Sequence, residues 1–242
     1  MKTLHRLTTK YHKIQIVQDQ KIRTLLSGTG FCQEQGAIDI EDLHKHIFDY
    51  SLLAMRGLEF IHCPQRILVI GLGGGIIPRE LRHTLPNSEI DIIEIDSDII
   101  DIAKEYFFFE EDDKMKIHKG DAFIITKEMQ EMGETYDLIV VDAFMENYTP
   151  FPLMSVEFIQ RLYDITSENA ILTVNSSVYH PSFSSQVKTY RSVFGDGIYS
   201  LNGDRNELST TIYVTKGNLE CPKGINTTED TENGKIFSIY NP

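Results

Sequence analysis

The sequence predicts an α/β protein built on a mainly parallel, doubly wound sheet, and three observations support this class. Segments typical of strands and helices alternate from residue 66 to residue 194. Some strand segments are continuously apolar, such as Ile67-Leu-Val-Ile, as expected for strands buried on both faces of a parallel sheet. A glycine run, Gly71-Leu-Gly-Gly-Gly, follows that strand directly and precedes the next helix.

The first 60 residues differ from the rest and predict a small β-hairpin element followed by a helix. Residues 11–18 alternate apolar and polar side chains, and residues 21–26 indicate a second short strand. Residues 39–60 carry apolar side chains three and four apart, which predicts a helix that Asp39 or Asp42 can cap.

The remaining elements follow in chain order. Helices are predicted at residues 78–84, 97–107, 122–132, 155–162 and 186–194. Strands are predicted at residues 66–71, 89–96, 114–119, 136–142, 170–175, 197–201 and 208–214. The short gap between the last two strands implies an antiparallel pair. A mainly parallel seven-stranded sheet with an antiparallel last strand is the arrangement of the Rossmann-like, class I S-adenosylmethionine-dependent methyltransferase fold.

This order of elements divides the chain into three segments. Residues 1–60 form the small N-terminal segment, and residues 61–216 form the Rossmann-like domain that is expected to carry the chemistry. Residues 217–242 are predicted to be a polar C-terminal tail.

Composition excludes several classes of protein. Apolar residues make up 41% of the chain and charged residues 24%, close to globular averages, which excludes wholesale disorder. No apolar run approaches the roughly 20 residues of a membrane helix, and the N-terminus lacks an apolar signal segment. We therefore expect a cytoplasmic protein with no membrane partner.

Charge and cysteine content restrict the partners further. The net charge is −13, from 23 Lys and Arg against 36 Asp and Glu, which argues against a nucleic acid partner. The same acidity either attracts a small amine-bearing substrate or simply maintains solubility. The three cysteines form no CxxC pair, so no metal site is expected.

Glycine or carboxylate residues stand at the carboxyl ends of four successive predicted strands, the edge where open α/β sheets bind ligands. The glycines let the backbone turn and approach a ligand closely. Glu94, at the end of the second strand, can accept both hydroxyls of a ribose, and Asp121 can accept from an adenine amino group. Each acid alone is better explained as a helix cap or a solvated residue, and Asp96 and Asp98 can also cap the next helix, but the four positions together favour a cofactor site. The positions concerned are Gly71, Gly73, Gly75, Glu94, Asp121 and Asp142.

The spacing of these residues discriminates between cofactors. The loop has no Lys-Ser/Thr ending and so is not a P-loop, and it lacks the G-x-G-x-x-G spacing of nicotinamide binders. A short GxGxG followed by acids after the second and third strands suits an S-adenosyl sulfonium cofactor.

The motif set resembles the spermidine synthase family, in a divergent branch that has GLGGG in place of GGGDGG. The resemblance covers roughly residues 11–215. It implies a small N-terminal β domain, a Rossmann-like catalytic domain and a homodimer. It also implies transfer of an aminopropyl group from decarboxylated S-adenosylmethionine to an amine. The motifs are Ile67–Gly75 with Pro78-Arg-Glu, Glu94-Ile-Asp, Gly120-Asp, Tyr136–Asp142, Gln35-Gly-Ala-Ile-Asp and the helix of Tyr50.

The resemblance also implies roles for single residues. Glu94 binds the ribose, Asp121 the adenine, and Asp142 holds and helps to deprotonate the attacking amine. Gln35, or alternatively Gln33, corresponds to the glutamine that touches the cofactor. Two residues correspond to the substrate gate and to the loop that helps to form the acceptor site, namely Tyr50 and Tyr148.

Departures from the family pattern leave the donor and the acceptor open. Gly74 and Met145 stand where the family has aspartates, and Ser51-Leu52 replaces a polar pair. Glu146 is one place from a missing acid and can partly replace it as a substrate-binding residue. The alternatives are therefore aminopropyl transfer to a small amine, N-methylation of an amine or peptide from S-adenosylmethionine, and nucleoside binding without turnover.

Overall fold

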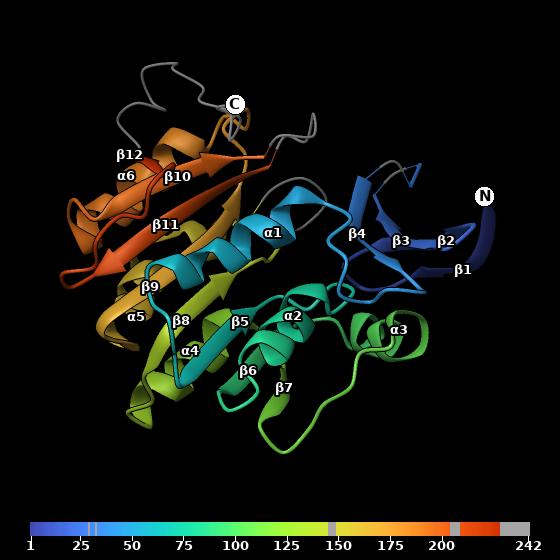
Figure 1. Ribbon diagram of the computed structural model, residues 1–242, viewed down its shortest axis with the longest axis horizontal. Helices are drawn as coiled ribbons and strands as arrows, with labels where there is room; N and C mark the ends of the chain where they lie inside the picture. Colours follow the sequence, from blue (N-terminus) through green and yellow to red (C-terminus); the bar gives the residue numbers. More distant parts are fainter. Residues whose placement is uncertain (29, 32, 145–148, 204–208, 228–242) are drawn as a thin grey trace.

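The computed structural model describes residues 1–28, 30–31, 33–144, 149–203 and 209–227. It has an eight-stranded sheet in the order β12-β10-β11-β9-β8-β5-β6-β7 and a four-stranded sheet in the order β1-β2-β3-β4 (Figure 1). The strands of the large sheet are β5 Arg66–Ile70, β6 Glu89–Glu94, β7 Met115–Lys119, β8 Tyr136–Val141, β9 Thr166–Ser176, β10 Ile198–Asn202, β11 Thr210–Lys216 and β12 Asn226–Thr227.

The predicted α/β class and sheet topology are confirmed. Strands β7, β6, β5, β8 and β9 pair in parallel, whereas β11 runs antiparallel to both of its neighbours, β9 and β10. Strand β12 adds two residues of the expected polar tail to the edge of β10, next to the buried side chain of Ile225.

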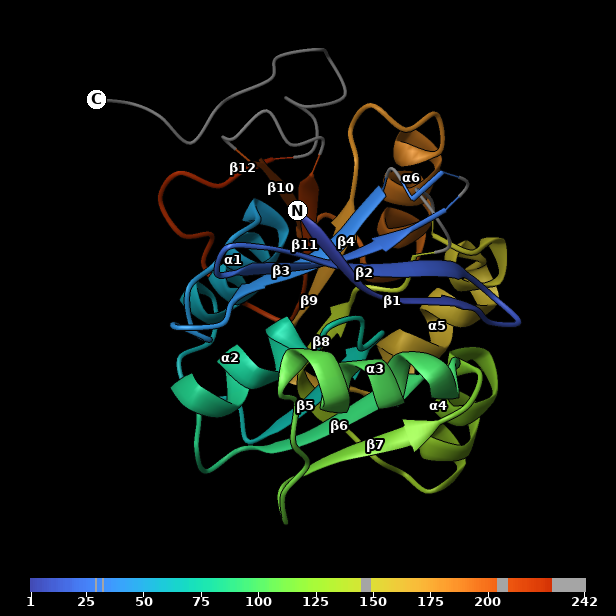
Figure 2. The ribbon, with the colours of Figure 1, turned by 90° about the vertical axis from the view of Figure 1, so that its right-hand side faces the viewer.

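Helices cover both faces of the large sheet, which explains the continuous apolar runs (Figure 2). In β5, Ile67 and Val69 face the core under α1, α2 and α3, whereas Leu68 and Ile70 face the core under α4, α5 and α6. The helices are α1 Asp49–Met55, α2 Ile76–Thr84, α3 Ser97–Phe107, α4 Ala122–Glu131, α5 Val156–Asp164 and α6 Phe183–Phe194.

The N-terminal β-element is larger than predicted. The two expected strands, β2 Lys13–Asp19 and β3 Ile22–Ser27, form the centre of an antiparallel sheet. Strand β1 Lys2–Thr8 pairs with β2, and β4 Gln33–Asp39 pairs with β3. Pairing with these central strands gives the two outer strands partners that local sequence periodicity does not indicate.

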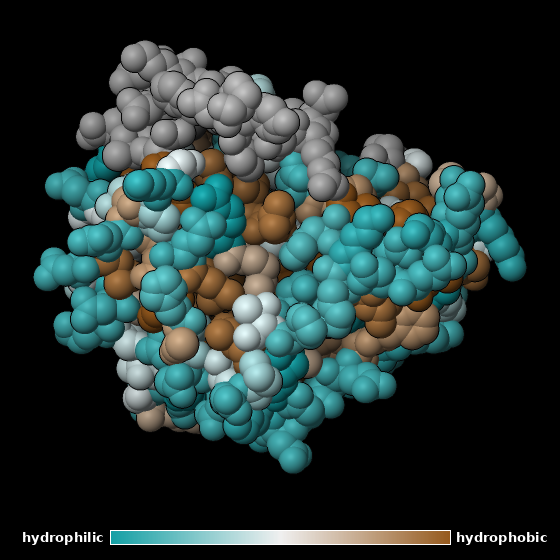
Figure 3. All heavy atoms as spheres, in the orientation of Figure 1, coloured by the Kyte–Doolittle hydropathy of each residue, from teal (hydrophilic) through white to brown (hydrophobic). Residues whose placement is uncertain are grey.

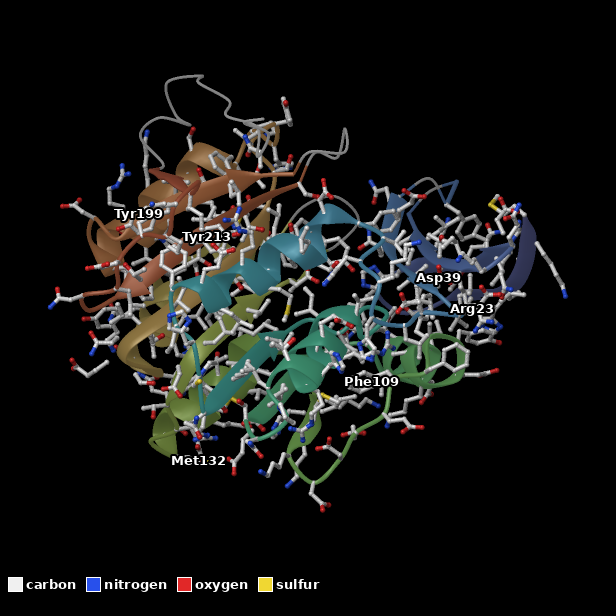
Figure 4. All side chains as sticks on the ribbon, viewed as in Figure 1. Arg23, Asp39, Phe109, Met132, Tyr199 and Tyr213 are labelled. Carbon is white, nitrogen blue, oxygen red and sulfur yellow. The ribbon has the colours of Figure 1, made fainter. Side chains whose placement is uncertain are left out.

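The helix predicted over residues 39–60 is wrong in its first half. Asp39 ends β4, where its buried carboxylate lies 3.1 Å from the Lys21 ammonium and 3.6 Å from the Lys45 ammonium (Figure 4). Neither it nor Asp42 caps a helix, because α1 begins after Phe48. Helix α1 continues as a 3₁₀ turn, η1 Arg56–Glu59, and packs on β11 through the Tyr213 hydroxyl, which donates to Leu53 O at 2.7 Å.

Hydrogen bonds and ring contacts attach the N-terminal sheet to α3. The Thr9 hydroxyl donates to Asp96 Oδ2 at 2.5 Å. Asp96 also caps α3 by accepting from the backbone N–H of Asp98, which confirms the capping role predicted as an alternative for Asp96. Arg23 donates to Tyr106 O at 2.5 Å and lies over the Phe108 ring (Figure 4). The small sheet is therefore fixed beside the carboxyl edge of the large one, on the right in Figure 1.

Hydrophilic residues cover much of the face shown in Figure 3, consistent with the net charge of −13. Within the described ranges, no helix has both the length and the apolar character that crossing a bilayer requires.

Thr9→Val should lower the free energy of unfolding by about 1–3 kcal/mol, because it leaves a buried carboxylate oxygen of Asp96 without its donor. Urea denaturation measures the change, and Thr8→Val is the matched control. Equal stability of the two variants would show that this contact does not hold the small sheet.

Candidate active site

A pocket of about 700 Å³ lies between the carboxyl ends of β5, β6, β8 and β9 and the N-terminal sheet. This volume is within the usual range for small-molecule sites. The pocket brings together most of the predicted site residues, namely Gly71, Gly73, Glu94, Asp121, Asp142, Gln35 and Tyr50. Glu146 and Tyr148 lie outside the described residues.

The glycine loop has two glycines that the site requires. Gly71 has φ +102°, and a Cβ there would come 2.2 Å from the backbone oxygen of Asp142. Gly73 has φ +54° and lines the pocket, and no atom lies within 4 Å of the position of a Cβ. The loop therefore leaves room for a ligand to approach its backbone at Gly73.

Gly75 is not part of the pocket wall. It precedes α2 with φ +70°, and a Cβ there would come 2.5 Å from the Phe109 ring, which Figure 4 labels. Glycine at this position is explained by the turn and by core packing, and not by contact with the pocket.

Glu94 supports the glycine loop and also faces the pocket. Its Oε2 accepts from the backbone N–H of Leu72, and its Oε1 accepts from that of Asp96, both at 2.9 Å. Burial raises the pKa of the Glu94 carboxyl above its usual value. A carboxylate has about four acceptor sites, so Glu94 keeps acceptor capacity for a ribose hydroxyl.

Asp121 caps α4, since its Oδ1 accepts from the backbone N–H of Phe123 at 2.9 Å. It also lines the pocket, so the capping interpretation and the ligand-binding interpretation are compatible. On the opposite wall, the Tyr50 hydroxyl donates to Gln35 O at 3.3 Å and joins α1 to β4.

The environment of Asp142 raises the pKa of its carboxyl strongly. Its carboxyl lies deep in the protein and is only partly exposed, through the pocket. Burial raises its pKa to about 7, the negative charge of Glu94 adds to this, and a hydrogen bond from Asn175 opposes it. Such a carboxyl can exchange a proton near neutral pH, which suits a general base.

Asn175 is a site residue that the sequence interpretation missed. Its Nδ2 donates to Asp142 Oδ1 at 2.8 Å from the carboxyl end of β9, the strand next to β8. The sequence predicted this residue only as the end of a strand. The available signal was the one used for the other positions, a polar side chain at the carboxyl edge of the sheet.

Among the described residues, no group of three or more His, Cys, Asp or Glu side chains is arranged to hold a metal ion. Metal-free chemistry therefore stays a prediction of the sequence.

Comparison with known proteins identifies relatives of two kinds. Residues 47–199 match the family model of the spermine/spermidine synthase domain. A polyamine aminopropyltransferase of Vibrio vulnificus is 34% identical over 195 residues, which are 80% of this chain and 65% of that protein. An eEF1A lysine and N-terminal methyltransferase of Xenopus laevis is 30% identical over 132 residues, 52% of this chain but 19% of that protein.

Solved structures show the same fold. A probable spermidine synthase from Corynebacterium glutamicum has a TM-score of 0.73 at 17% identity, covering 87% of this chain and 79% of that one. Human methyltransferase-like protein 13, in complex with SAH, has a TM-score of 0.58 at 22% identity, covering 76% and 85%.

The chain thus spans less than two thirds of the length of these sequence relatives, while the family model matches more than half of the chain. The chain therefore belongs to the spermine/spermidine synthase family and has the fold that this family shares with S-adenosyl-dependent methyltransferases.

Proposed function

We propose that this protein transfers an aminopropyl group from decarboxylated S-adenosylmethionine to a small amine, the type of reaction used in polyamine biosynthesis. The observation that carries the proposal is Asp142, a deep carboxyl beside the glycine loop with a pKa raised to about 7. The similarity to the Vibrio vulnificus aminopropyltransferase supports it. The proposal includes a cytoplasmic homodimer, as expected from the sequence and the family resemblance.

The donor would bind along the carboxyl edge of the sheet. Gly73 leaves room for the donor to approach the loop backbone, Gly71 holds the loop close to Asp142, and the remaining acceptor capacity of Glu94 suits a ribose hydroxyl. Asp121 is proposed to accept from the adenine amino group, and Gln35 to touch the donor from the N-terminal sheet.

When bound, the donor would supply a carbon bonded to a positively charged sulfur. The acceptor nitrogen would form a bond to this carbon as the C–S bond breaks, with neutral methylthioadenosine as the leaving group. An alkylamine has a pKa near 10.4, so at neutral pH it is almost fully protonated and cannot attack. Asp142 accepts a proton from it, while Asn175 holds the carboxylate oriented. The walls from both sheets orient the acceptor in the pocket.

N-methylation is the second candidate, and a specific observation favours it. A Cβ on Gly74 would come 2.7 Å from Ile76 Cδ1 and 3.0 Å from Phe107 Cδ1. An aspartate here would require the Ile76 side chain to shift, and with glycine in its place one partner for the ammonium of a decarboxylated donor is missing. The similarity to eEF1A methyltransferases also supports this candidate, with a peptide amine as the acceptor.

A transfer assay distinguishes the candidates. The protein is incubated with each donor and a panel of diamines, monoamines and lysine peptides, and the products are identified by mass. Aminopropylated diamine supports the proposal, and methylated product supports the second candidate. Nucleoside binding without any product would support the third, non-enzymatic interpretation.

The pH dependence of turnover should follow the ionisation of Asp142. Because the carboxylate is the active form, kcat/KM for the donor should fall as pH decreases through about 7. The positively charged sulfur of the bound donor stabilises the Asp142 carboxylate and lowers its pKa, so the midpoint of the kcat profile should lie at lower pH than that of kcat/KM.

Asp142→Asn should lower turnover by about 10²–10⁴, whereas Asp101→Asn, exposed on α3, should not. Wild-type turnover in Asp142→Asn would make this carboxyl merely structural.

Asn175→Ala should move the kcat/KM midpoint to higher pH. The hydrogen bond from Asn175 lowers the pKa of Asp142, so its loss lets burial raise that pKa further. Steady-state profiles of both proteins measure the shift. An unchanged midpoint would mean that Asn175 does not tune Asp142.

Glu94→Gln should weaken binding of S-adenosylhomocysteine about ten- to hundredfold, because it removes an acceptor and places an amide N–H against the loop. Calorimetry measures the affinity, and Glu89→Gln, exposed at the start of β6, is the control. Equal affinity in the two variants would remove the ribose assignment.

A further inference from the structure

The Thr9 hydroxyl lies between residues of the two walls of the pocket. Its oxygen accepts from the backbone N–H of Tyr11 at 3.0 Å and from that of His12 at 2.9 Å, and it donates to Asp96 Oδ2 at 2.5 Å. A hydroxyl has one donor and two acceptor sites, so these three contacts use its whole hydrogen-bonding capacity. One side chain therefore links the small sheet to the carboxyl end of β6.

On the small sheet, Thr9 shapes the turn between β1 and β2. The backbone N–H of Thr9 donates to His12 O at 2.8 Å, and the two hydrogen bonds to the Thr9 hydroxyl close the same turn. Threonine hydroxyls favour such turns by accepting from nearby backbone N–H groups. Because Tyr11 and His12 both line the pocket, this hydroxyl fixes a part of the pocket wall.

On the large sheet, Asp96 connects Thr9 to the carboxylate that is proposed to bind the ribose. Asp96 is buried, and its backbone N–H donates to Glu94 Oε1 at 2.9 Å. Its Oδ1 accepts from the N–H of Asp98 at 3.1 Å, and its Oδ2 accepts from Thr9. The hydroxyl of Thr9 thus restrains the turn whose N–H orients Glu94.

Other contacts of the small sheet with α3 lie away from the pocket. Arg23 donates to Tyr106 O, and the His5 and Tyr106 rings stack with their centroids 5.4 Å apart. Tyr106 is in the last turn of α3, and none of these three residues lines the pocket. Asp96, in contrast, caps the first turn of α3. The Thr9 contact is therefore placed to act on the pocket, whereas these other contacts only attach the sheet.

We infer that Thr9 is a positioning residue for binding of the S-adenosyl donor. Its hydroxyl holds the turn of Tyr11 and His12 and the Asp96–Glu94 turn at one fixed separation, so that both sides of the pocket are ordered before the nucleoside enters. A site that is already ordered binds with a smaller loss of conformational freedom. The inference rests on the proposed function, because Glu94 is assigned to the donor ribose there.

Two substitutions of Thr9 test this role. Thr9→Val removes the hydroxyl and keeps the shape of the side chain, whereas Thr9→Ser keeps the hydroxyl. By calorimetry, Thr9→Val should bind S-adenosylhomocysteine about five- to fiftyfold more weakly than the wild type, because Asp96 and the N–H groups of the turn lose a partner. Thr9→Ser should restore the affinity to within about threefold of the wild type. Thr8→Val, exposed at the end of β1, is the control.

A double-mutant cycle tests whether Thr9 acts through Glu94. If it does, the losses of affinity in Thr9→Val and Glu94→Gln should be less than multiplicative in the double variant, because the two substitutions weaken one chain of contacts. All affinities are compared at a temperature at which circular dichroism shows every variant folded. In the transfer assay, Thr9→Val should raise KM for the donor and leave kcat at saturating donor close to that of the wild type. Multiplicative losses of affinity, or a lower kcat with an unchanged KM, would overturn the inference.

The same measurements separate this inference from the proposed reaction. Equal affinity in Thr9→Val and the wild type, with a lower melting temperature of the variant, would assign Thr9 to the fold alone and overturn the inference. Weakened binding in Thr9→Val, with no transfer product from the wild type, would reject the proposed reaction and support the positioning role. Absence of binding by the wild type would reject the donor site and the inference together.

Discussion

The close approach of two backbones, at Gly71 and Asp142, is the constraint on which the site depends. The N–H of Asp142 donates to Ile70 O, and that of Gly71 donates to Ile93 O, both at 2.8 Å, so the ends of β5, β6 and β8 are tied together. Because a Cβ at Gly71 would come 2.2 Å from Asp142 O, glycine is required there. The glycine loop and the Asp142 carboxyl are consequently fixed relative to each other before any ligand binds.

The second wall of the pocket comes from outside the Rossmann-like domain. The small N-terminal sheet is fixed to α3 through Thr9 and Arg23, and it presents the end of β4 to the carboxyl edge of the large sheet. The large sheet thus provides the glycine loop and Asp142, the proton acceptor of the proposed reaction. The small sheet provides part of the opposite wall, including Gln35.

Much of the large sheet was predictable because burial on both faces leaves continuous apolar runs such as Ile67–Ile70, and because a glycine or an acid follows four of the predicted strands. The failures have a common physical origin in contacts between distant segments. The first half of the helix predicted from Asp39 is absent because that carboxylate is held by Lys21 and Lys45 at the end of a strand. Asn175 becomes a site residue only because β9 lies beside β8, and the contact of Thr9 with Asp96 joins residues that are 87 positions apart in the sequence.

A crystal structure with S-adenosylhomocysteine or methylthioadenosine bound tests the central claim most directly, because it locates the nucleoside relative to every proposed partner at once. We expect the ribose hydroxyls within hydrogen-bond distance of Glu94, the adenine amino group at Asp121, and the sulfur on the side of the pocket that faces Asp142. A nucleoside bound outside this pocket, or inside it with the adenine against Asp142, would contradict both the donor site and the assignment of the proton acceptor.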